Sequence, residues 1–421
     1  MREAILVKAT AKLALIFLLL SVSALGWSQT QTFTNVAVTG TESVGKWNNI
    51  RIVDGVKFQT IAAAIADLPS GVGGVVYSDL PETFTANPFD PNRPVKLVLG
   101  MGTWSTDVPL TLTSNSQIVG SGRGEGNQGT VIMAAGAFPT NSAVISLGET
   151  VPAGPFGGQT FGERLEGVRV DCNNIPGSTG MYNNTAGELS GPYHVAVSGC
   201  MAVGIDYEGT YSQNAGPISD VVIAPSLSAP MTFVGIKVNG VTAFRGIRGA
   251  TISNAGIPNT QVVAIEISGV PGGNIADVHC EYLGTCVMVS SNSEVNVSNI
   301  DGYQVTNLVH LDSTSKNVNL WNLHGFSGTY SIVDDVFGYT NTLGQIGFYS
   351  IGDGGTRISS INTLPAQFNS GVQLGGSSAT WTTGKGVPSG ACTKGSVFTR
   401  TDGVAGATLY VCETGAGWAS K

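Results

Sequence analysis

The sequence predicts an all-β protein: a single-stranded right-handed parallel β-helix with an N-terminal capping helix and a small C-terminal β module. Three observations support this fold class. Glycine is abundant, at 58 of 421 residues. Only 11% of residues are charged, whereas 42% are hydrophobic. Short segments rich in Val and Ile recur at similar spacing. Low charge with this many hydrophobic residues argues against disorder. Many short apolar segments separated by turn residues are typical of all-β chains.

Residues 1–28 have the pattern of a secretory signal peptide. Positively charged residues precede an apolar run over residues 13–20, and small residues near 26–28 permit cleavage. A membrane anchor is the weaker interpretation, because the run is shorter than the roughly 20 residues of a spanning helix. We therefore expect a secreted or extracellular protein, with the periplasm and the cell surface as alternative locations. After removal of the signal peptide, we expect no membrane insertion.

A short strand pattern recurs along residues 160–340. Its equivalent inward positions lie 27, 26, 29, 26, 22 and 23 residues apart, at Val170, Val197, Ile223, Ile252, Val278, Ile300 and Leu323. A second series interleaves with it, at Ile205, Ile236, Ile265, Val287 and Val309. Such series predict stacked rungs, because one rung cannot bury its own apolar face. The leucine ladder of a leucine-rich repeat is missing, and the Asn-Gly or Asp-Gly turns of a β-sandwich are sparse.

An amphipathic segment over residues 57–68 predicts a helix that covers the open end of the core, since its apolar residues share one face. This segment, together with Gly73–Tyr77 and Ser114–Gly122, resembles the N-terminal part of the pectate-lyase superfamily. The resemblance covers about residues 54–134 and implies a capping helix that leads into the first rungs of a right-handed β-helix. The insertion Ser78 to Pro94 departs from that pattern, and we expect it to form a surface loop.

The domain organisation follows from these patterns. We expect the β-helix over residues 29–350, a linker rich in Gly, Ser and Thr over 351–380, and a small disulfide-stapled module over 381–421. The order of the cysteines suggests local pairs: Cys172 with Cys200, Cys280 with Cys286, and Cys392 with Cys412. Six cysteines allow fifteen connectivities, so the sequence alone leaves the pairing open. An exported protein can keep disulfides.

Candidate functional residues gather on the last three rungs. Neighbours of the inward positions point outward, and stacked rungs bring equivalents to about 4.8 Å. The columns that result are Asp277, Asn299 and Asn322; His279, Asp301 and His324; and Glu281, Tyr303 and Phe326. We predict Asp277, His279, Asp301 and His324 as catalytic residues. The predicted substrate-binding residues are Glu281, Asn299, Tyr303, Asn322, Phe326 and Arg248.

This mixture suits a sugar-binding groove, and two reaction types fit it. In a hydrolase, Asp277 and Asp301 would be acid and base, with His279 or His324 tuning them or shuttling a proton. A lyase would need a base and a cation or arginine beside a uronate. We assign no metal or cofactor; Ca²⁺ at Asp277, Glu281 and Asp301, and a transition metal at His279, Asp301 and His324, are left open. The resemblance implies no specific activity, because the polygalacturonase-type catalytic motifs are missing.

The sequence therefore predicts a secreted protein that acts on or binds an extracellular polysaccharide, as a lyase or glycoside hydrolase if it is an enzyme. The alternative is a non-catalytic carbohydrate-binding, adhesin-like or structural β-helix protein. Nucleic acid is excluded as a partner, because 20 Lys and Arg against 28 Asp and Glu provide no basic surface for phosphates. Homo-oligomerisation is left open.

Overall fold

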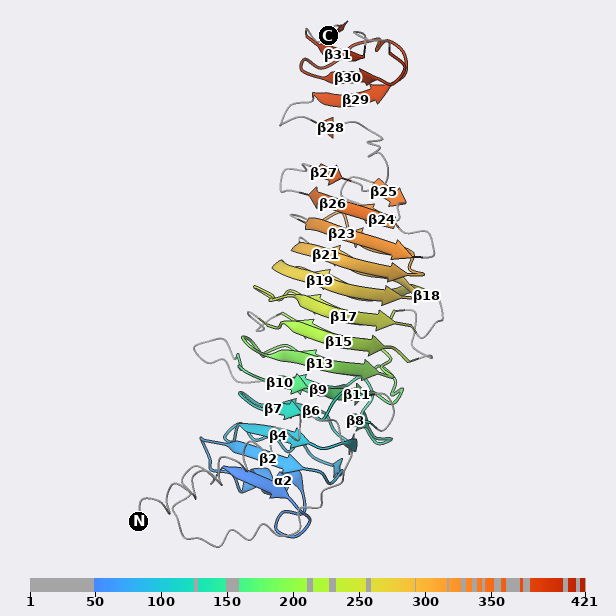
Figure 1. Ribbon diagram of the computed structural model, residues 1–421. Coiled ribbons are helices and arrows are strands. Elements are labelled where there is room, and N and C mark those ends of the chain that lie inside the picture. Colours follow the sequence, from blue (N-terminus) through green and yellow to red (C-terminus); the bar gives the residue numbers. More distant parts are fainter. Residues whose placement is uncertain are drawn as a thin grey trace, which may run out of the picture. The chain divides into compact units, whose positions relative to one another are not determined.

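A computed structural model, shown as a ribbon in Figure 1, describes most of the chain beyond residue 48. The described residues are 49–124, 128–148, 159–209, 215–226, 232–254, 259–291, 293–315, 318–326, 331–334, 339–342, 345–351, 357–360, 372–373, 379–403, 408–413 and 417–420. The predicted signal peptide lies outside them. Within these ranges, no helix is long and apolar enough to cross a membrane.

Parallel strands stack into a β-helix, as the sequence and the resemblance to the pectate-lyase superfamily predict (Figure 1). The larger sheet of the described chain has 17 strands. These are β1 (Ile50–Val53), β2 (Gly74–Ser78), β3 (Thr83–Phe84), β4 (Val95–Leu99), β5 (Gly102–Thr106), β7 (Gln117–Val119), β8 (Thr130–Ala134), β10 (Arg164–Glu166), β11 (Val168–Asp171), β13 (Gly191–Ser198), β15 (Ile218–Ala224), β17 (Ile247–Ser253), β19 (Pro271–Glu281), β21 (Glu294–Tyr303), β23 (Val318–Phe326), β26 (Gln345–Ile351) and β27 (Arg357–Ser360).

A second sheet, of ten strands in the described residues, forms the other wall of the β-helix. Its strands are β6 (Leu110–Leu112), β9 (Ala143–Leu147), β12 (Thr179–Asn183), β14 (Val203–Glu208), β16 (Val234–Asn239), β18 (Asn259–Ser268), β20 (Leu283–Ser290), β22 (Asn307–Leu311), β24 (Ser331–Asp334) and β25 (Tyr339–Thr342). From β11 to β24 the chain alternates between the two sheets, so one strand from each makes a rung. Each strand pairs in parallel with its equivalent one rung away.

The core lies between the two sheets, because alternate side chains of every strand point inward. Val195 and Val197 of β13 and Ile236 and Val238 of β16 are at most 1% exposed. Burying an aliphatic side chain of this size contributes about 1.5–3 kcal/mol. The stacked rungs share one continuous hydrophobic cluster, which extends from Val53 in β1 to Ile332 in β24.

The register of the larger sheet confirms most of the predicted inward series. Val170 to Ile252 are in register, and so are Val278 to Leu323. The step between them is wrong by two residues, because β19 places Val278 beside Ala250. Side chains alternate with a period of two, so a slip of two residues keeps the same face inward. Hydrophobicity therefore does not distinguish the two registers.

A residue in the left-handed conformation interrupts the strands of the larger sheet at the same place in seven successive rungs. These residues are Gly167, His194, Asp220, Gly249, Asp277, Asn299 and Asn322, with φ between 50° and 68°. Glycine has no Cβ to clash in this conformation, and Asn and Asp tolerate it better than other residues. Ser298 and Asn299 are both at least partly exposed, so the inward–outward alternation shifts by one residue here.

The capping helix is α2 (Ile61–Ala66), which is shorter than the predicted 57–68. The carboxylate of Asp54 accepts hydrogen bonds from the backbone N–H groups of Val56, Lys57 and Phe58. Because of this turn, the residues before Thr60 are not helical. The hydroxyl of Thr60 caps the helix by accepting a hydrogen bond from the N–H of Ala63 at 3.2 Å. Ile61 and Ile65 are nearly fully buried, so α2 packs on the core as expected.

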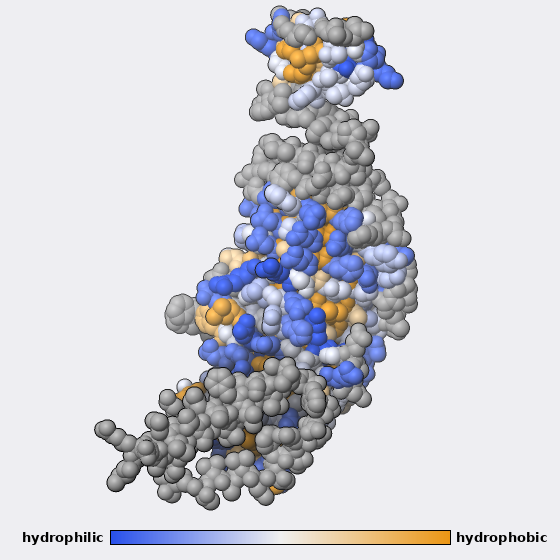
Figure 2. Space-filling view, in the orientation of Figure 1, coloured by the Kyte–Doolittle hydropathy of each residue, from blue (hydrophilic) through white to orange (hydrophobic). Residues whose placement is uncertain are grey.

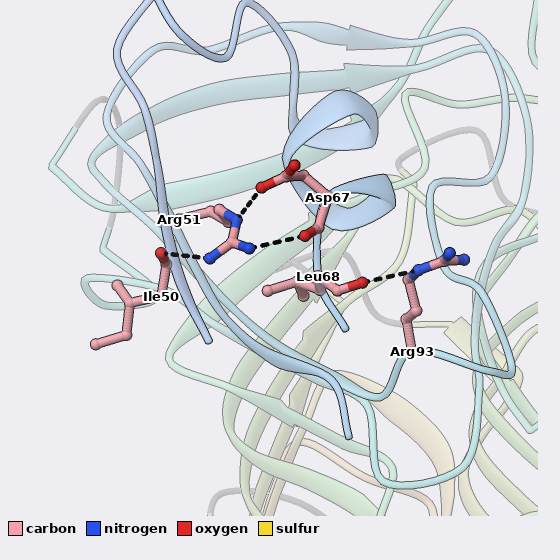
Figure 3. Close-up of polar contacts among 5 residues, drawn as sticks. All are labelled: Ile50, Arg51, Asp67, Leu68 and Arg93. Carbon is pink, nitrogen blue, oxygen red and sulfur yellow. Dashed lines mark hydrogen bonds and ion pairs between the residues drawn. The ribbon is translucent and has the colours of Figure 1, made fainter. Parts of the chain in front are cut away.

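Two arginines fasten the C-terminal end of α2 to the first rungs (Figure 3). Arg51 of β1 donates from Nε to the Asp67 carboxylate at 2.5 Å and from Nη2 to the Asp67 carbonyl at 2.7 Å. Arg93 donates from Nε to the carbonyl of Leu68 at 3.0 Å. These bonds satisfy carbonyls that the end of a helix leaves unpaired.

The insertion Ser78 to Pro94 is largely a surface loop, as predicted, but part of it packs on the core. It contains β3, and Phe84 and Phe89 are only 3% and 6% exposed. The ring of Phe84 stacks on that of Trp104, with centroids 6.5 Å apart. Burial of these two aromatic side chains holds the loop against the core, a contact that the surface-loop prediction did not include.

All three suggested disulfides are present. Cys172–Cys200 joins successive rungs just after β11 and β13, whereas Cys280–Cys286 joins the two sheets within one rung. Cys392–Cys412 staples the C-terminal strands. The described residues contain no free cysteine.

Pairing changes to antiparallel where the β-helix ends. β26 pairs antiparallel with β23 and with β27, and β25 pairs antiparallel with β24. The C-terminal strands form their own five-stranded sheet, made of β28 (Val372–Gln373), β29 (Thr380–Gly384), β30 (Val397–Arg400), β31 (Leu409–Cys412) and β32 (Trp418–Ser420). Tyr410 is buried in this sheet, and the rings of Phe398 and Trp418 lie 5.9 Å apart. These contacts give the aromatic residues a structural role.

Candidate functional site

β19, β21 and β23 carry the predicted site residues on one outward face, except Arg248, which lies in the neighbouring strand β17. Asp301 lies in register between His279 and His324, and Tyr303 lies between Glu281 and Phe326. The predicted columns are therefore confirmed. The side chain of Phe326 lies outside the described residues. In Figure 2 the larger sheet faces the viewer, and hydrophilic side chains cover much of it with hydrophobic ones between them.

Asp277 is held by its neighbours above and below. Its carboxylate accepts a hydrogen bond from Nδ2 of Asn299 at 2.8 Å and pairs with Nε of Arg248 at 3.3 Å. Asn322 donates in turn to the side-chain oxygen of Asn299 at 3.0 Å. A second amide ladder runs parallel to this one, through Asn274, Asn296 and Asn319, with bonds of 3.0 and 2.8 Å. These side chains bond along the solenoid axis, which is a structural role that the sequence prediction had not assigned them.

His279 and Glu281 form a pair within one strand. Nε2 of His279 lies 2.9 Å from the Glu281 carboxylate, at about one-third exposure for each side chain. The hydrogen bond from His279 lowers the pKa of Glu281, and a further bond from Ser253 on the adjacent rung lowers it too, while burial opposes both. Glu281 is thereby kept charged.

Asp301 and His324 are the more open pair of this face. Nδ1 of His324 lies 3.6 Å from Oδ1 of Asp301, and the two side chains are 38% and 53% exposed. The ring of Tyr303 meets that of Tyr282 edge to face, with centroids 5.3 Å apart. Asp301 therefore remains accessible to a ligand while an aromatic pair lies beside it.

Trp321 belongs to the same face and was missed by the sequence prediction. It lies in register with Ala276 and Ser298, and it is 59% exposed. The signal was present, since Trp321 immediately precedes Asn322 in the outward column. Because Asn322 has a left-handed backbone, both residues point away from the core, which simple alternation does not predict.

The described residues contain no group of three or more His, Cys, Asp or Glu side chains that could hold a metal ion. The Ca²⁺ alternative at Asp277, Glu281 and Asp301 therefore has no support in the geometry. The same holds for a transition metal at His279, Asp301 and His324. The ladder bond of Asp277 and the pairing of His279 with Glu281 already direct these side chains to protein partners.

A second set of charged side chains occupies the outward face of the ten-stranded sheet. Asp206 of β14, Lys237 of β16 and Glu266 of β18 are in register on successive rungs. Nζ of Lys237 lies 2.7 Å from Oε1 of Glu208 and 3.9 Å from Oδ1 of Asp206. In the sequence these charges alternate in sign, each directly after an inward residue of the second series. That series established the period of the rungs, and no functional role was predicted for the charges.

Asp206 has a strongly altered acidity. Its side chain is 14% exposed, and Oδ1 is buried without a hydrogen-bond partner. Burial is the main reason that its pKa rises to about 6; the charge of Lys237 opposes this rise, and those of Glu208 and Glu266 contribute to it. A carboxyl that titrates near neutrality is typical of functional sites, although ion-pair networks produce it too.

No family model matches the chain, and no curated protein matches it significantly. Solved structures with some similarity include ORF18 of Geobacillus virus E2, at 13% identity and a TM-score of 0.39, covering 89% of this chain and 86% of that one. Another is a putative glycosyl hydrolase of Parabacteroides merdae, at 11% identity and a TM-score of 0.26, covering 55% of this chain and 81% of that one. A third is the GH87 α-1,3-glucanase catalytic unit of Streptomyces thermodiastaticus, at 15% identity and a TM-score of 0.29, covering 66% of this chain and 64% of that one.

Proposed function

We propose that the chain is exported and binds an extracellular polysaccharide along the outward face of β19, β21 and β23. The observation that carries this proposal is the alignment of Asp301 between His279 and His324, beside the exposed ring of Trp321. Sugar hydroxyls need hydrogen-bonding side chains at regular spacing, and the apolar face of a sugar ring packs on an aromatic ring. Consecutive rungs about 4.8 Å apart supply such a repeat.

Export is supported by three disulfides and by the predicted signal peptide. Disulfides persist in oxidising compartments and are rare in the cytosol. All three pairs lie in the part of the chain that would remain after cleavage at residue 28.

Catalysis by Asp277, His279, Asp301 and His324 stays a prediction. Acid–base catalysis gains most in a closed site that excludes water. Asp277 already bonds to Arg248 and Asn299, and Asp301 is 53% exposed. This geometry favours binding over catalysis on the face of β19, β21 and β23.

The test is retention of the purified chain on a panel of neutral and acidic polysaccharides, with reducing ends and unsaturated uronates assayed in parallel. Trp321→Ala should weaken binding about tenfold, the usual loss for a central aromatic contact. Trp381→Ala is the matched control, because Trp381 is 47% exposed but belongs to the C-terminal sheet.

Four outcomes decide between the alternatives. Loss of retention in Trp321→Ala alone supports the proposed face. Loss in Trp381→Ala alone moves binding to the C-terminal sheet and overturns the proposal, as does no retention on any polymer. Product release that Asp301→Asn abolishes would add catalysis at this face, as a lyase if the product is unsaturated and as a hydrolase if it is not.

A further inference from the structure

A cavity of about 390 Å³ opens on the ten-stranded sheet, away from the face of β19, β21 and β23. Its wall is mostly apolar, formed by Pro176, Met201, Val203 and Val234, and Lys237 and Glu266 supply its charges. Cavities of 300–1,000 Å³ with apolar walls and a few polar groups are typical of small-molecule sites. The size and lining therefore suit a compact ligand with one apolar face.

The charges at this cavity are unequally matched. Lys237 is engaged by Glu208 at 2.7 Å and lies 3.9 Å from Asp206. Glu208 also accepts a hydrogen bond from Nδ2 of Asn239 at 3.0 Å. Glu266, by contrast, makes no hydrogen bond or ion pair among the described residues. Three carboxyl groups thus surround one ammonium group. The carboxylate that lines the cavity is that of Glu266, which acts on Lys237 only through its charge and not through a hydrogen bond.

Asp206 lies in register with Lys237 on the neighbouring rung and contributes to the imbalance. Its Oδ1 is buried without a hydrogen-bond partner, and burial together with Glu208 and Glu266 raises the pKa of this carboxyl to about 6, against the effect of Lys237. Negative charge is therefore unfavourable here in the absence of a ligand. A positive charge beside Glu266 would relieve it.

We propose that this cavity is a second binding site, and that it takes a protonated amino sugar unit, with the ammonium group at Glu266 and the sugar ring against Met201, Val203 and Val234. An anion is disfavoured, because Lys237 is already neutralised by Glu208 and Asp206. A bare metal ion is disfavoured, because the described residues form no group of metal-ligating side chains. An organic cation with an apolar face satisfies both the carboxylate and the wall.

The test compares two hexasaccharides by calorimetry at pH 6: the β-1,4-linked hexamer of glucosamine and its fully N-acetylated counterpart. They share ring and linkage and differ in the charge of the amine. We expect the glucosamine hexamer to bind at least tenfold more tightly. Glu266→Gln should remove this preference, whereas Glu166→Gln, in β10 of the opposite sheet, should leave it unchanged.

Thr232→Trp provides a second variant that leaves the charges intact. Thr232 is exposed at the rim of the cavity, so a larger side chain should block entry without disturbing the core. Loss of glucosamine-hexamer binding in both Glu266→Gln and Thr232→Trp supports the site. Equal binding of the two hexamers, no binding of either, or unchanged binding in Thr232→Trp would overturn it. Retention on the polysaccharide panel through Trp321 does not depend on these results.

Discussion

The left-handed residues of the larger sheet allow a quantitative test at Asn299. Its amide donates to Asp277 at 2.8 Å and accepts from Asn322 at 3.0 Å, and its φ is 53°. Replacement by alanine removes both side-chain bonds, each worth about 0.5–1.5 kcal/mol net. It also places an ordinary residue in the left-handed region, at about 1–2 kcal/mol. The expected cost of Asn299→Ala is about 2–5 kcal/mol.

Asn299→Gly separates the two contributions. Glycine also loses the hydrogen bonds, but it adopts positive φ without steric cost and pays only about 0.5–1 kcal/mol in conformational entropy. Asn299→Gly should therefore be less destabilised than Asn299→Ala by about 1 kcal/mol. Gly167 and Gly249 occupy the same position in other rungs, which shows that glycine is compatible with the backbone there.

Hydrogen exchange measured by mass spectrometry suits this comparison, because stacked rungs open locally and a single unfolding free energy is poorly defined. Peptides that cover β19, β21 and β23 should exchange about 30-fold or more faster in Asn299→Ala, while β13 and β15 remain unchanged. Equal exchange in the alanine and glycine variants would refute the conformational argument. Unchanged exchange in both would refute the contribution of the amide ladder.

Three further perturbations have defined outcomes. Burial raises the pKa of Asp206 from an ordinary 3.8 to about 6, so between these pH values the folded state binds a proton that the unfolded state does not. The free energy of unfolding should therefore fall as the pH rises through this window. In thermal melts from pH 4 to 7.5, Asp206→Asn should reduce that fall by about 1–2 kcal/mol after allowance for screening. Gly204→Val should strongly destabilise the folded protein or abolish its expression, because a Cβ at this position would lie 2.5 Å from the carbonyl oxygen of Gly235. Gly136→Ala is the control in the same melts, since Gly136 has open space around it. Cys172→Ser should lower the melting temperature of the oxidised protein, and an unchanged melting temperature would mean that this staple contributes nothing.

Much of the fold follows from sequence periodicity. The spacing of Val278, Ile300 and Leu323 predicts both the rungs and their register, because a buried face permits little choice once the strands are stacked. The step from Ile252 to Val278 escaped prediction, since Ala250 and Ile252 are both apolar and both inward. The extent of α2 escaped it as well, because the carboxylate of Asp54 competes for backbone N–H groups that a helical pattern assigns to a helix.

The candidate site is predictable in composition but less so in role. Alternation places Asp301 and His324 side by side, as the structure does. It does not predict that Asp277 has a left-handed backbone and bonds along the ladder, because that conformation depends on the rung above and the rung below. The cavity beside Glu266 depends on turns such as that at Pro176, whose paths no strand pattern determines.

The bond between Cys172 and Cys200 has a mechanical consequence. A stack of coils that contact only their neighbours unreels under tension, one coil at a time, beginning from the pulled end. A covalent link between two successive coils stops this process, because the 28-residue interval between the two cysteines cannot be drawn straight. At about 3.5 Å per residue the link withholds roughly 100 Å of contour length until it is reduced. Under load the chain would thus extend to a length that depends on whether this disulfide is oxidised or reduced.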